Sequence, residues 1–380
     1  MRNSLDKRLS FAVIGAGNGG QAMAGYLALK GYKVNLYNRS IERIIDIKQR
    51  GYIDLVGFCS GRGVLNLVTN NIERAIKNVD VIMVVLPASA HKFIANKIAP
   101  IITSNQYIVL NPGRTGGALE FKNIISKHNP IKEVCIIEAQ TLLFACRSLE
   151  NGQVKIFGKK NEVKVSALPA IRTNEFIGIV NNAFPEFTQS KNVLETSFNN
   201  VGAMLHPIPT ILNCGRIENT HGDFQYYIDG ITPSISNVIR EADRERMLIA
   251  KKLNVNAISL SQWLNYTYGA KGDTLCQSLI NTRGYHGITA PSTMETRYIY
   301  EDVPQSLVPI SDMGRHLGIH TPTINSIIQL ASIINNTDYF KYGRKIADMG
   351  LDRLSTVDEI VNYVVIGKIS TDSSNEGVVA

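Results

Sequence analysis

The first half of the chain alternates short apolar runs with segments of helical periodicity. Apolar runs bounded by glycine, proline or polar residues are typical of strands buried on both faces of a sheet. Strands are expected at residues 11–14, 32–37, 80–87, 107–110, 133–138, 154–157 and 163–168, with shorter β-like runs within 52–70. Helices are expected at residues 21–30, 41–50, 72–78, 91–102, 117–127 and 174–183. This alternation predicts an α/β domain built on a doubly wound parallel sheet.

The second half of the chain, from residue 192, changes to longer segments with the spacing of amphipathic helices. These segments are expected at residues 193–205, 233–253, 258–267, 274–281, 311–317, 321–334 and 355–363. No second alternation of strands and helices follows, so this half predicts an all-helical domain. We therefore expect an α/β domain at residues 1–188, a helical substrate and catalytic domain at 189–369, and a flexible polar tail at 370–380.

Composition leaves this organisation unchanged and narrows the range of partners. With 380 residues, 44% of them hydrophobic and 19% charged, the chain can form two domains with separate cores. The net charge of +8 comes from scattered basic residues, which either attract anionic ligands or form a solvated surface. No basic run is interleaved with aromatic residues, and no segment approaches the length of a membrane span. Neither a nucleic acid nor a membrane is therefore an expected partner.

The cysteines point to a reducing compartment. They are far apart in the sequence, and they show neither a CxxC motif nor the Cys/His spacing of a zinc site. The five are Cys59, Cys135, Cys146, Cys214 and Cys276. We expect free thiols, no metal site and, since no secretory leader is recognisable, a cytoplasmic location.

A glycine motif occupies the turn between the first expected strand and helix. Gly15, Gly17 and Gly20 form Gly-x-Gly-x-x-Gly, with the spacing and setting of the Rossmann fingerprint. The first glycine permits a tight turn, the second lets the backbone approach a pyrophosphate, and the third lets the helix lie close to the strand. The helix N-terminus then attracts phosphates. We expect a dinucleotide-binding Rossmann domain, the alternative being a structural turn without a ligand.

The end of the second strand bears on which dinucleotide binds. NAD sites usually carry an acid there, whereas this chain has Asn38 and Arg39, followed by Ser40 and Arg43. A guanidinium at this position can grip a 2′-phosphate with two hydrogen bonds, which favours NADP(H). NAD(H) stays an alternative, in which Arg39 is a surface residue or stacks on adenine.

Ligands of doubly wound sheets bind beyond the carboxyl ends of the strands, so the residues that follow the strands complete the expected site. The expected cofactor-binding residues are Gly15, Gly17, Asn18, Gly19, Gly20, Asn38, Arg39, Ser40, Arg43, Leu86, Pro87, His91, Asn111 and Gly113.

The helical half concentrates polar residues in a few segments that can carry acid–base chemistry. His206 can exchange a proton near neutral pH, and Asp302 can orient it and stabilise its charged form. Arg297 offers a fork for a carboxylate. Spacing alone also allows a purely structural role for His206 and a surface ion pair for Arg297. Further candidates for substrate binding are Asn200, Thr141 and Tyr298.

In these segments the chain resembles the opine dehydrogenases, the octopine/nopaline group that includes bacterial N-(1-carboxyalkyl)amino-acid dehydrogenases. The resemblance covers nearly the whole chain, and its most specific motifs are HPIPTILN at 206–213, FQYYIDGITPS at 224–234, TRYIYEDV at 296–303 and LVP at 307–309. It implies a helical domain like that of 6-phosphogluconate dehydrogenase, a catalytic pair of His206 and Asp302, and Arg297 as a carboxylate anchor. The end of the second strand departs from the NAD-using members, which carry an acid there.

The implied reaction condenses an amino acid with a 2-oxo acid such as pyruvate through an imine, which NADPH reduces to an N-(1-carboxyalkyl)amino acid. Two alternatives stay open. One is a 2-hydroxy-acid, keto-acid or glycerol-3-phosphate-type dehydrogenase on the same scaffold, whose usual catalytic lysine is not found after Lys191 on the corresponding helix. The other is a sensor that binds NADP(H) without turnover. The expected partners are small-molecule substrates, the amino acid and the 2-oxo acid. Assembly is left open, with a homodimer as one form.

Overall fold

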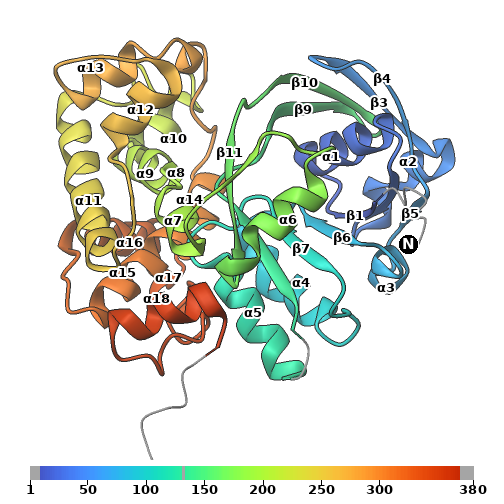
Figure 1. Cartoon of the computed structure of the whole chain (residues 1–380). Helices are drawn as coiled ribbons and strands as arrows, with labels where there is room; N and C mark the ends of the chain where they lie inside the picture. Colours follow the sequence, from blue (N-terminus) through green and yellow to red (C-terminus); the bar gives the residue numbers. More distant parts are fainter. Residues whose placement is uncertain (1–8, 131–132, 369–380) are drawn as a thin grey trace, which may run out of the picture.

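The computed structural model describes residues 9–130 and 133–368, so the expected tail at 370–380 lies outside the described residues. An α/β half and a helical half lie side by side (Figure 1). The last strand of the α/β half ends at Gln189, and the first helix of the other half begins at Val193. Among the described helices, none combines the length and the apolar character that a membrane span requires.

The main sheet of the α/β half has eight strands. They are, in spatial order, β12 (Phe187–Gln189), β11 (Val163–Leu168), β8 (Cys135–Ala139), β7 (Tyr107–Leu110), β6 (Val81–Val84), β1 (Ser10–Ile14), β2 (Lys33–Tyr37) and β5 (Leu67–Thr69). Neighbouring strands are parallel except β11, which runs antiparallel to β8. The predicted doubly wound sheet is therefore present, but it is a mixed sheet, because β8 and β11 are antiparallel.

A second, four-stranded sheet was not expected from the sequence. Its spatial order is β4 (Gly61–Val64), β3 (Tyr52–Gly57), β10 (Gln153–Lys159) and β9 (Phe144–Glu150). It covers the helix α1 (Asn18–Leu29), and two glycines allow the close approach. A Cβ atom on Gly63 would lie 2.4 Å from the carbonyl oxygen of Gly25. The expected β-like runs at 52–70 are thus mostly part of this separate layer.

Helices cover both faces of the main sheet, because its buried strands present apolar residues on both sides. One face carries α1, α2 (Ile45–Arg50) and α6 (Thr173–Val180), and the other carries α3 (Ile72–Ile76), α4 (His91–Ile98) and α5 (Gly117–His128). Successive residues of β1 alternate accordingly: Phe11 and Val13 join the first cluster, and Ala12 and Ile14 the second.

Among the described residues after β12, regular structure is helical apart from one isolated bridge between Gln225 and Thr289. The helices are α7 (Val193–Phe198), α8 (Gly202–Leu205), α9 (Pro207–Leu212), α10 (Cys214–Thr220), α11 (Pro233–Lys252), α12 (Leu260–Tyr268), α13 (Leu275–Ile280), α14 (Arg297–Tyr300), α15 (Val308–His316), α16 (Pro322–Ile334), α17 (Tyr339–Tyr342) and α18 (Val357–Ile366). A π-helical turn at Val303–Leu307 leads directly into α15.

The helix expected at 193–205 is interrupted between α7 and α8. The side chain of Asn199 bonds to the backbone of Asn256 and Ile258, and the amide of Asn200 donates to the carbonyl of Gln140. These tertiary hydrogen bonds hold Asn199 and Asn200 in place at the break between the two helices. Periodicity could not reveal them, because they depend on segments that are distant in the sequence.

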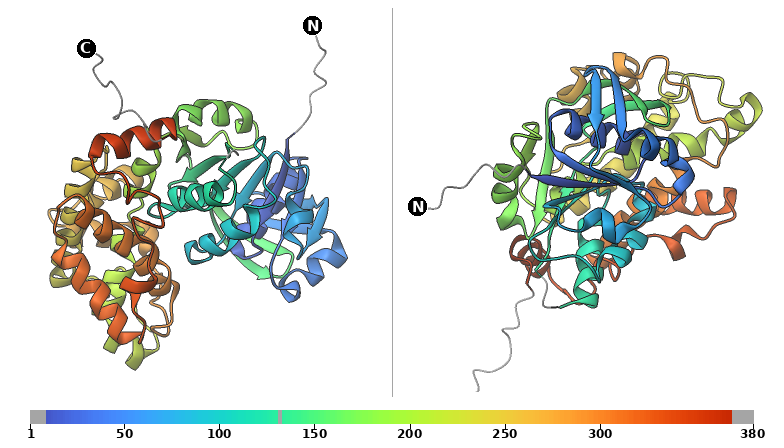
Figure 2. Two further views of the ribbon diagram at one scale, coloured as in Figure 1. Left: turned by 90° about the horizontal axis from the view of Figure 1, so that it is seen from below. Right: turned by 90° about the vertical axis from the view of Figure 1, so that its right-hand side faces the viewer.

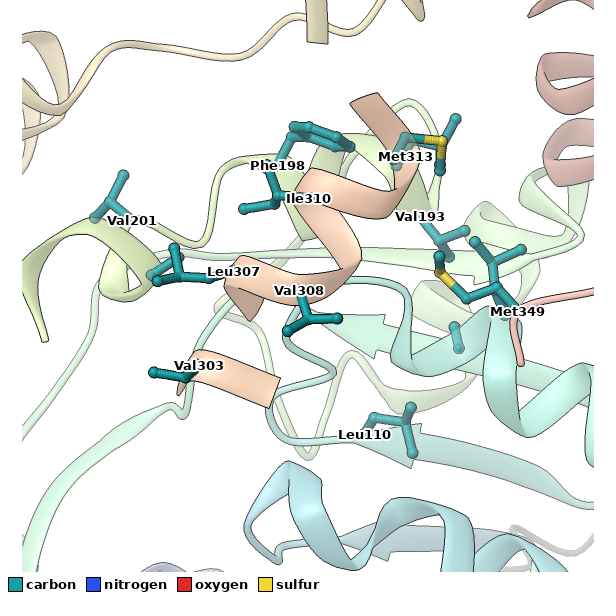
Figure 3. Packing of buried hydrophobic residues seen from close by; sticks show 14 of the residues in the cluster. Leu110, Val193, Phe198, Val201, Val303, Leu307, Val308, Ile310, Met313 and Met349 are labelled. Carbon is teal, nitrogen blue, oxygen red and sulfur yellow. The ribbon is translucent and has the colours of Figure 1, made fainter. Parts of the chain in front are cut away.

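One hydrophobic cluster joins the two halves. Leu110 at the end of β7 belongs to the same buried cluster as Val193, Leu307 and Val308 of the helical half (Figure 3). In addition, α18 returns to the first half and contacts β11 and the turn Ala170–Arg172 (red in Figure 2). The carboxyl ends of the central strands are consequently fixed against the helical half.

Candidate active site

The glycine loop after β1 has the shape that the sequence predicts. Gly15 has a φ of +113°, a backbone angle that residues with a side chain rarely adopt. Its N–H donates to the carbonyl of Tyr37 at 2.8 Å. A Cβ on Gly20 would lie 1.8 Å from the carbonyl oxygen of Gly15, whereas a Cβ on Gly17 would find no atom within 4 Å. The open space at Gly17 fits a phosphate group at the N-terminus of α1.

The side chains around the loop hold it in place. Asn38 accepts a hydrogen bond from the backbone N–H of Ala16 at 3.2 Å, so it anchors the loop to the end of β2. Asn18 accepts from the backbone N–H of Ser148 in β9 at 3.1 Å. Leu86 and Leu142 lie against the positions that Cβ atoms on Gly15 and Gly19 would occupy.

The basic residues after β2 are accessible to a ligand. Arg39 and Arg43 are exposed, and Ser40 is partly exposed. The guanidinium carbon of Arg39 lies 5.7 Å from the ring centroid of Phe93 on α4, itself an exposed aromatic residue. This arrangement suits either role expected of Arg39, contact with a phosphate or stacking beside an adenine.

The loops after β6 and β7 hold the remaining expected cofactor residues. Pro87 is exposed, but Asn111 is buried and donates to the carbonyl of Val109. Gly113 leaves no room for a side chain, since its Cβ would lie 2.3 Å from Cγ of Glu138. His91 is fully buried against Phe121, and its Nδ1 atom lies 3.5 Å from a guanidinium nitrogen of Arg344. Its burial and the nearby arginines hold its pKa well below the usual value, so its imidazole is neutral.

His206 and Asp302 meet although they are distant in the sequence. His206 lies between α8 and α9, where Pro207 begins the second helix, and Asp302 immediately precedes the π-helical turn. The atoms His206 Nδ1 and Asp302 Oδ2 are 3.0 Å apart. The side chain of Asp302 is fully buried and that of His206 is 20% exposed, so the imidazole edge faces outward from an anchored carboxylate.

Arg114 is a further member of this site, which follows the expected cofactor residues Asn111 and Gly113 in the loop after β7. It follows β7 with a φ of +58°, and its guanidinium reaches across to the helical half. Its Nη1 atom is 2.7 Å from Asp302 Oδ1, and its Nε atom is 3.3 Å from Glu301 Oε1. Burial alone would raise the pKa of Asp302, but Arg114 and His206 hold it below its usual value. Asp302 is therefore a carboxylate.

Glu301 connects the same site to a further loop. Its Oε1 atom accepts from the backbone N–H of Ala88, after β6, at 3.0 Å, and its Oε2 atom lies 3.0 Å from Nε of Arg297. Arg297 itself is 55% exposed, so part of its fork faces solvent. Arg297 is thus both oriented by a buried acid and open to an anionic ligand.

The other expected substrate residues surround the His206–Asp302 pair. The ring of Tyr298 stacks on the imidazole of His206, with centroids 4.5 Å apart and an angle of 12° between the planes. Asn200 accepts a hydrogen bond from Arg114. Thr141 lies one residue beyond Gln140, whose carbonyl accepts from Asn200, so it is near this cluster without a bond to the pair itself.

A further buried acid, Glu138, lies at the end of β8. It accepts hydrogen bonds from the hydroxyl groups of Thr196 and Ser197 on α7 and from the backbone N–H of Ala118. Burial outweighs these bonds and raises its pKa to about 7. Within residues 9–130 and 133–368, no group of His, Cys, Asp and Glu side chains is arranged to hold a metal ion.

Both halves of the chain match known protein families. Residues 189–335 match the family described as NAD/NADP octopine/nopaline dehydrogenase, alpha-helical domain, and residues 10–111 match the NAD binding domain of 6-phosphogluconate dehydrogenase. An opine dehydrogenase of Arthrobacter sp. is 40% identical over 347 residues, which are 91% of this chain and 96% of that protein. A vitopine synthase of Allorhizobium ampelinum is 24% identical over 353 residues, covering 90% and 95%.

Solved structures share the fold. An octopine dehydrogenase with NADH and L-arginine superposes with a TM-score of 0.76 at 19% identity, covering 93% of this chain and 98% of that chain. A yersinopine dehydrogenase with NADP+ bound reaches 0.71 at 13% identity, covering 94% and 98%. The predicted fold class, a Rossmann domain followed by a helical domain like that of 6-phosphogluconate dehydrogenase, is therefore confirmed.

Replacement by alanine should have different effects at Gly20 and at Gly17. Gly20→Ala places a methyl group against the backbone of Gly15, so the protein should lose several kcal/mol of stability, as overpacked sites do. Gly17→Ala meets no protein atom and should fold normally, but it should weaken dinucleotide binding at least tenfold. Thermal unfolding and fluorescence titration with NADPH measure both effects. Equal destabilisation by the two substitutions would contradict this geometry.

The raised pKa of Glu138 predicts a pH-dependent stability. The folded state holds this proton more tightly than the unfolded chain, where a glutamate has a pKa of about 4.3. The resulting stabilisation is present below that value and is lost as the pH rises through about 7. Between pH 5 and pH 8, wild-type protein should lose about 3 kcal/mol of unfolding free energy relative to Glu138→Gln. Urea unfolding tests this, with exposed Glu42→Gln as control; parallel pH profiles for wild type and Glu138→Gln would refute it.

Proposed function

Since the chain belongs to the opine dehydrogenase family, we propose that it reductively joins an amino acid to a 2-oxo acid such as pyruvate. The family consists of NAD(P)-dependent oxidoreductases that act on CH–NH groups. The observation that carries the proposal is the pair of His206 and buried Asp302, held at 3.0 Å beside an exposed guanidinium. This set suits condensation and proton transfer better than binding alone.

His206 carries the protons in this proposal. The amine attacks the carbonyl carbon of the 2-oxo acid, and the resulting carbinolamine must lose water to give an imine. Both steps need a group that gives and takes protons near neutral pH. With Nδ1 held by Asp302, the Nε2 atom of His206 is left for this transfer, and the carboxylate stabilises the imidazolium that forms. When bound, the nicotinamide supplies the hydride that reduces the imine carbon.

Arg297 anchors the carboxylate of the 2-oxo acid. It is exposed on one side, and Glu301 fixes its orientation through Nε, so its terminal nitrogens are available for a two-point contact. Tyr298 forms the wall beside the imidazole, and Asn200 and Thr141 offer hydrogen bonds to the substrates. Arg114 is too buried for such a contact and instead positions Asp302.

NADP(H) is the proposed cofactor, with NAD(H) as the alternative. The glycine loop would hold the pyrophosphate, and Arg39 with Ser40 and Arg43 would hold a 2′-phosphate. Asn38 and Arg39 stand directly after β2, where NAD sites usually carry an acid, and this supports the preference, since an acid there would repel that phosphate. A cytoplasmic location and a homodimer stay predictions, as do the identities of the amino acid and the 2-oxo acid.

The reaction can be tested by following the oxidation of NADPH with pyruvate and a panel of amino acids. Wild-type protein should turn over at least one pair. His206→Ala should lower kcat by about 10²–10⁴-fold while binding NADPH normally, because only proton transfer is lost. Substitution of the exposed His320 by Ala serves as control and should leave kcat unchanged. Turnover retained by His206→Ala would exclude the proposed role, and an inactive wild type that binds NADPH would favour the sensor.

Cofactor preference is tested at Arg39. Arg39→Asp should weaken NADPH binding by at least tenfold while leaving NADH binding within about threefold, because it removes a phosphate contact and supplies a ribose acceptor. Arg240→Asp makes the same charge change on α11, at an exposed position of the helical half. Titration with both cofactors distinguishes a specific contact from a general charge effect. An equal loss for NADPH and NADH would show that Arg39 does not touch the 2′-phosphate.

A further inference from the structure

Lys160 lies in the turn between β10 and β11 and reaches the loop after β8. Its Nζ atom donates to the hydroxyl oxygen of Thr141 at 2.7 Å and to the carbonyl of Leu142 at 2.8 Å. Its backbone N–H donates to the carbonyl of Leu143 at 3.0 Å, which fixes the base of the side chain. The ammonium group is therefore held at a defined place by neutral acceptors.

Lys160 differs from the nearest lysines in its partners. Lys159 pairs with Glu186 and Lys164 pairs with Glu162, but Lys160 has no acidic partner in the described part of the chain. The side chain of Lys160 is exposed, although the protein around it lowers the pKa of the ammonium to about 8. An exposed ammonium that is held by neutral acceptors and has no acidic partner is accessible to an anion.

The position of Lys160 is between the glycine loop and the reacting pair. Leu142, which accepts from Lys160, lies against Gly19 of the glycine loop. On the other side, Gln140 precedes Thr141 and accepts from Asn200, which in turn accepts from Arg114 beside Asp302. An anion bound at Lys160 would thus lie close to where the substrates must meet the nicotinamide.

The proposed reaction brings a second carboxylate to the site. Its product carries two carboxylates, one from the 2-oxo acid and one from the amino acid. Arg297 is assigned to the first, and Arg114 is only 6% exposed and already paired with Asp302 and Glu301. Lys160, which bonds to Thr141 next to Gln140, is a further cation of this region and has no acidic partner among the described residues.

We propose that Lys160 and Thr141 form the subsite for the α-carboxylate of the amino-acid substrate. The ammonium supplies a charge-assisted hydrogen bond to one oxygen. The hydroxyl oxygen of Thr141 accepts from Lys160, so its own hydrogen is available to the other oxygen. This inference rests on the proposed function and adds to it the group that distinguishes an amino acid from a simple amine.

The subsite is tested after wild-type turnover has been established, so that a failure of the proposed function is recognised separately. Lys160→Met keeps the length of the side chain and removes its charge. It should raise the KM for the amino acid by about tenfold or more, the usual effect of losing a charged hydrogen bond, with the KM for pyruvate unchanged. Lys160→Arg should restore most of the affinity, and Lys164→Met is the matched control.

Amines without the carboxylate provide a second readout. Agmatine in place of L-arginine, or phenethylamine in place of L-phenylalanine, should lose affinity for wild-type enzyme but show no further loss with Lys160→Met. Relative to the KM for agmatine, whose amine must also lose a proton before it attacks, the wild-type KM for L-arginine should rise as the pH passes about 8, where Lys160 loses its proton. This profile needs no variant and keeps the subsite testable should Lys160→Met fail to fold.

A different outcome would identify another role. If Lys160→Met instead raises the Kd for NADPH in a fluorescence titration and leaves the amino-acid KM unchanged, the anion is a cofactor phosphate and the subsite is refuted. An equal loss of affinity for the amino acid and for its decarboxylated amine would also overturn it, because the carboxylate would then make no contact with Lys160.

Discussion

The arrangement of the site depends on the neutralisation of acids buried at the junction of the two halves. Asp302, Glu301 and Glu120 are each no more than 3% exposed, and an unpaired charge at such a place is strongly unfavourable. Arg114 reaches from the α/β half to the first two, and Arg344, near the end of the described chain, reaches back to Glu120. Each arginine crosses the junction in the opposite direction. The carboxylate of Asp302, which His206 contacts within the helical half, consequently gains its arginine partner only when both halves are in their native relation.

The sequence could predict those parts of the molecule that local spacing determines. The glycine loop, the buried strands and the long helices depend on neighbours a few residues apart, and periodicity reports such neighbours directly. The pairing of His206 with Asp302 and the place of Arg297 beside them came from longer motifs and a family resemblance. Spacing alone would have left His206 indistinguishable from a structural histidine.

The remaining features depend on contacts that no local pattern contains. The sequence could not single out Arg114 among the residues of its loop. Its importance depends on a left-handed backbone and on an ion pair with Asp302, which is distant along the chain. His91 was expected beside the cofactor, but it is fully buried, since α4 and α5 pack its ring against Phe121. The second sheet was missed for a similar reason: β3 finds its parallel partner in β10, far along the chain.

The contact between Asn38 and the glycine loop has a consequence for how such enzymes diverge. The carbonyl oxygen of the Asn38 side chain receives the N–H of Ala16, and a carboxylate is isosteric with that amide and offers the same acceptor. An exchange of asparagine for aspartate would therefore keep the acceptor for Ala16 but lose the bond that the side-chain amide of Asn38 donates to the carbonyl of Ser40 at 2.9 Å. The residue that fixes the glycine loop thus also sets the charge that meets the ribose, so a change of cofactor preference at this position also disturbs the segment that holds the loop.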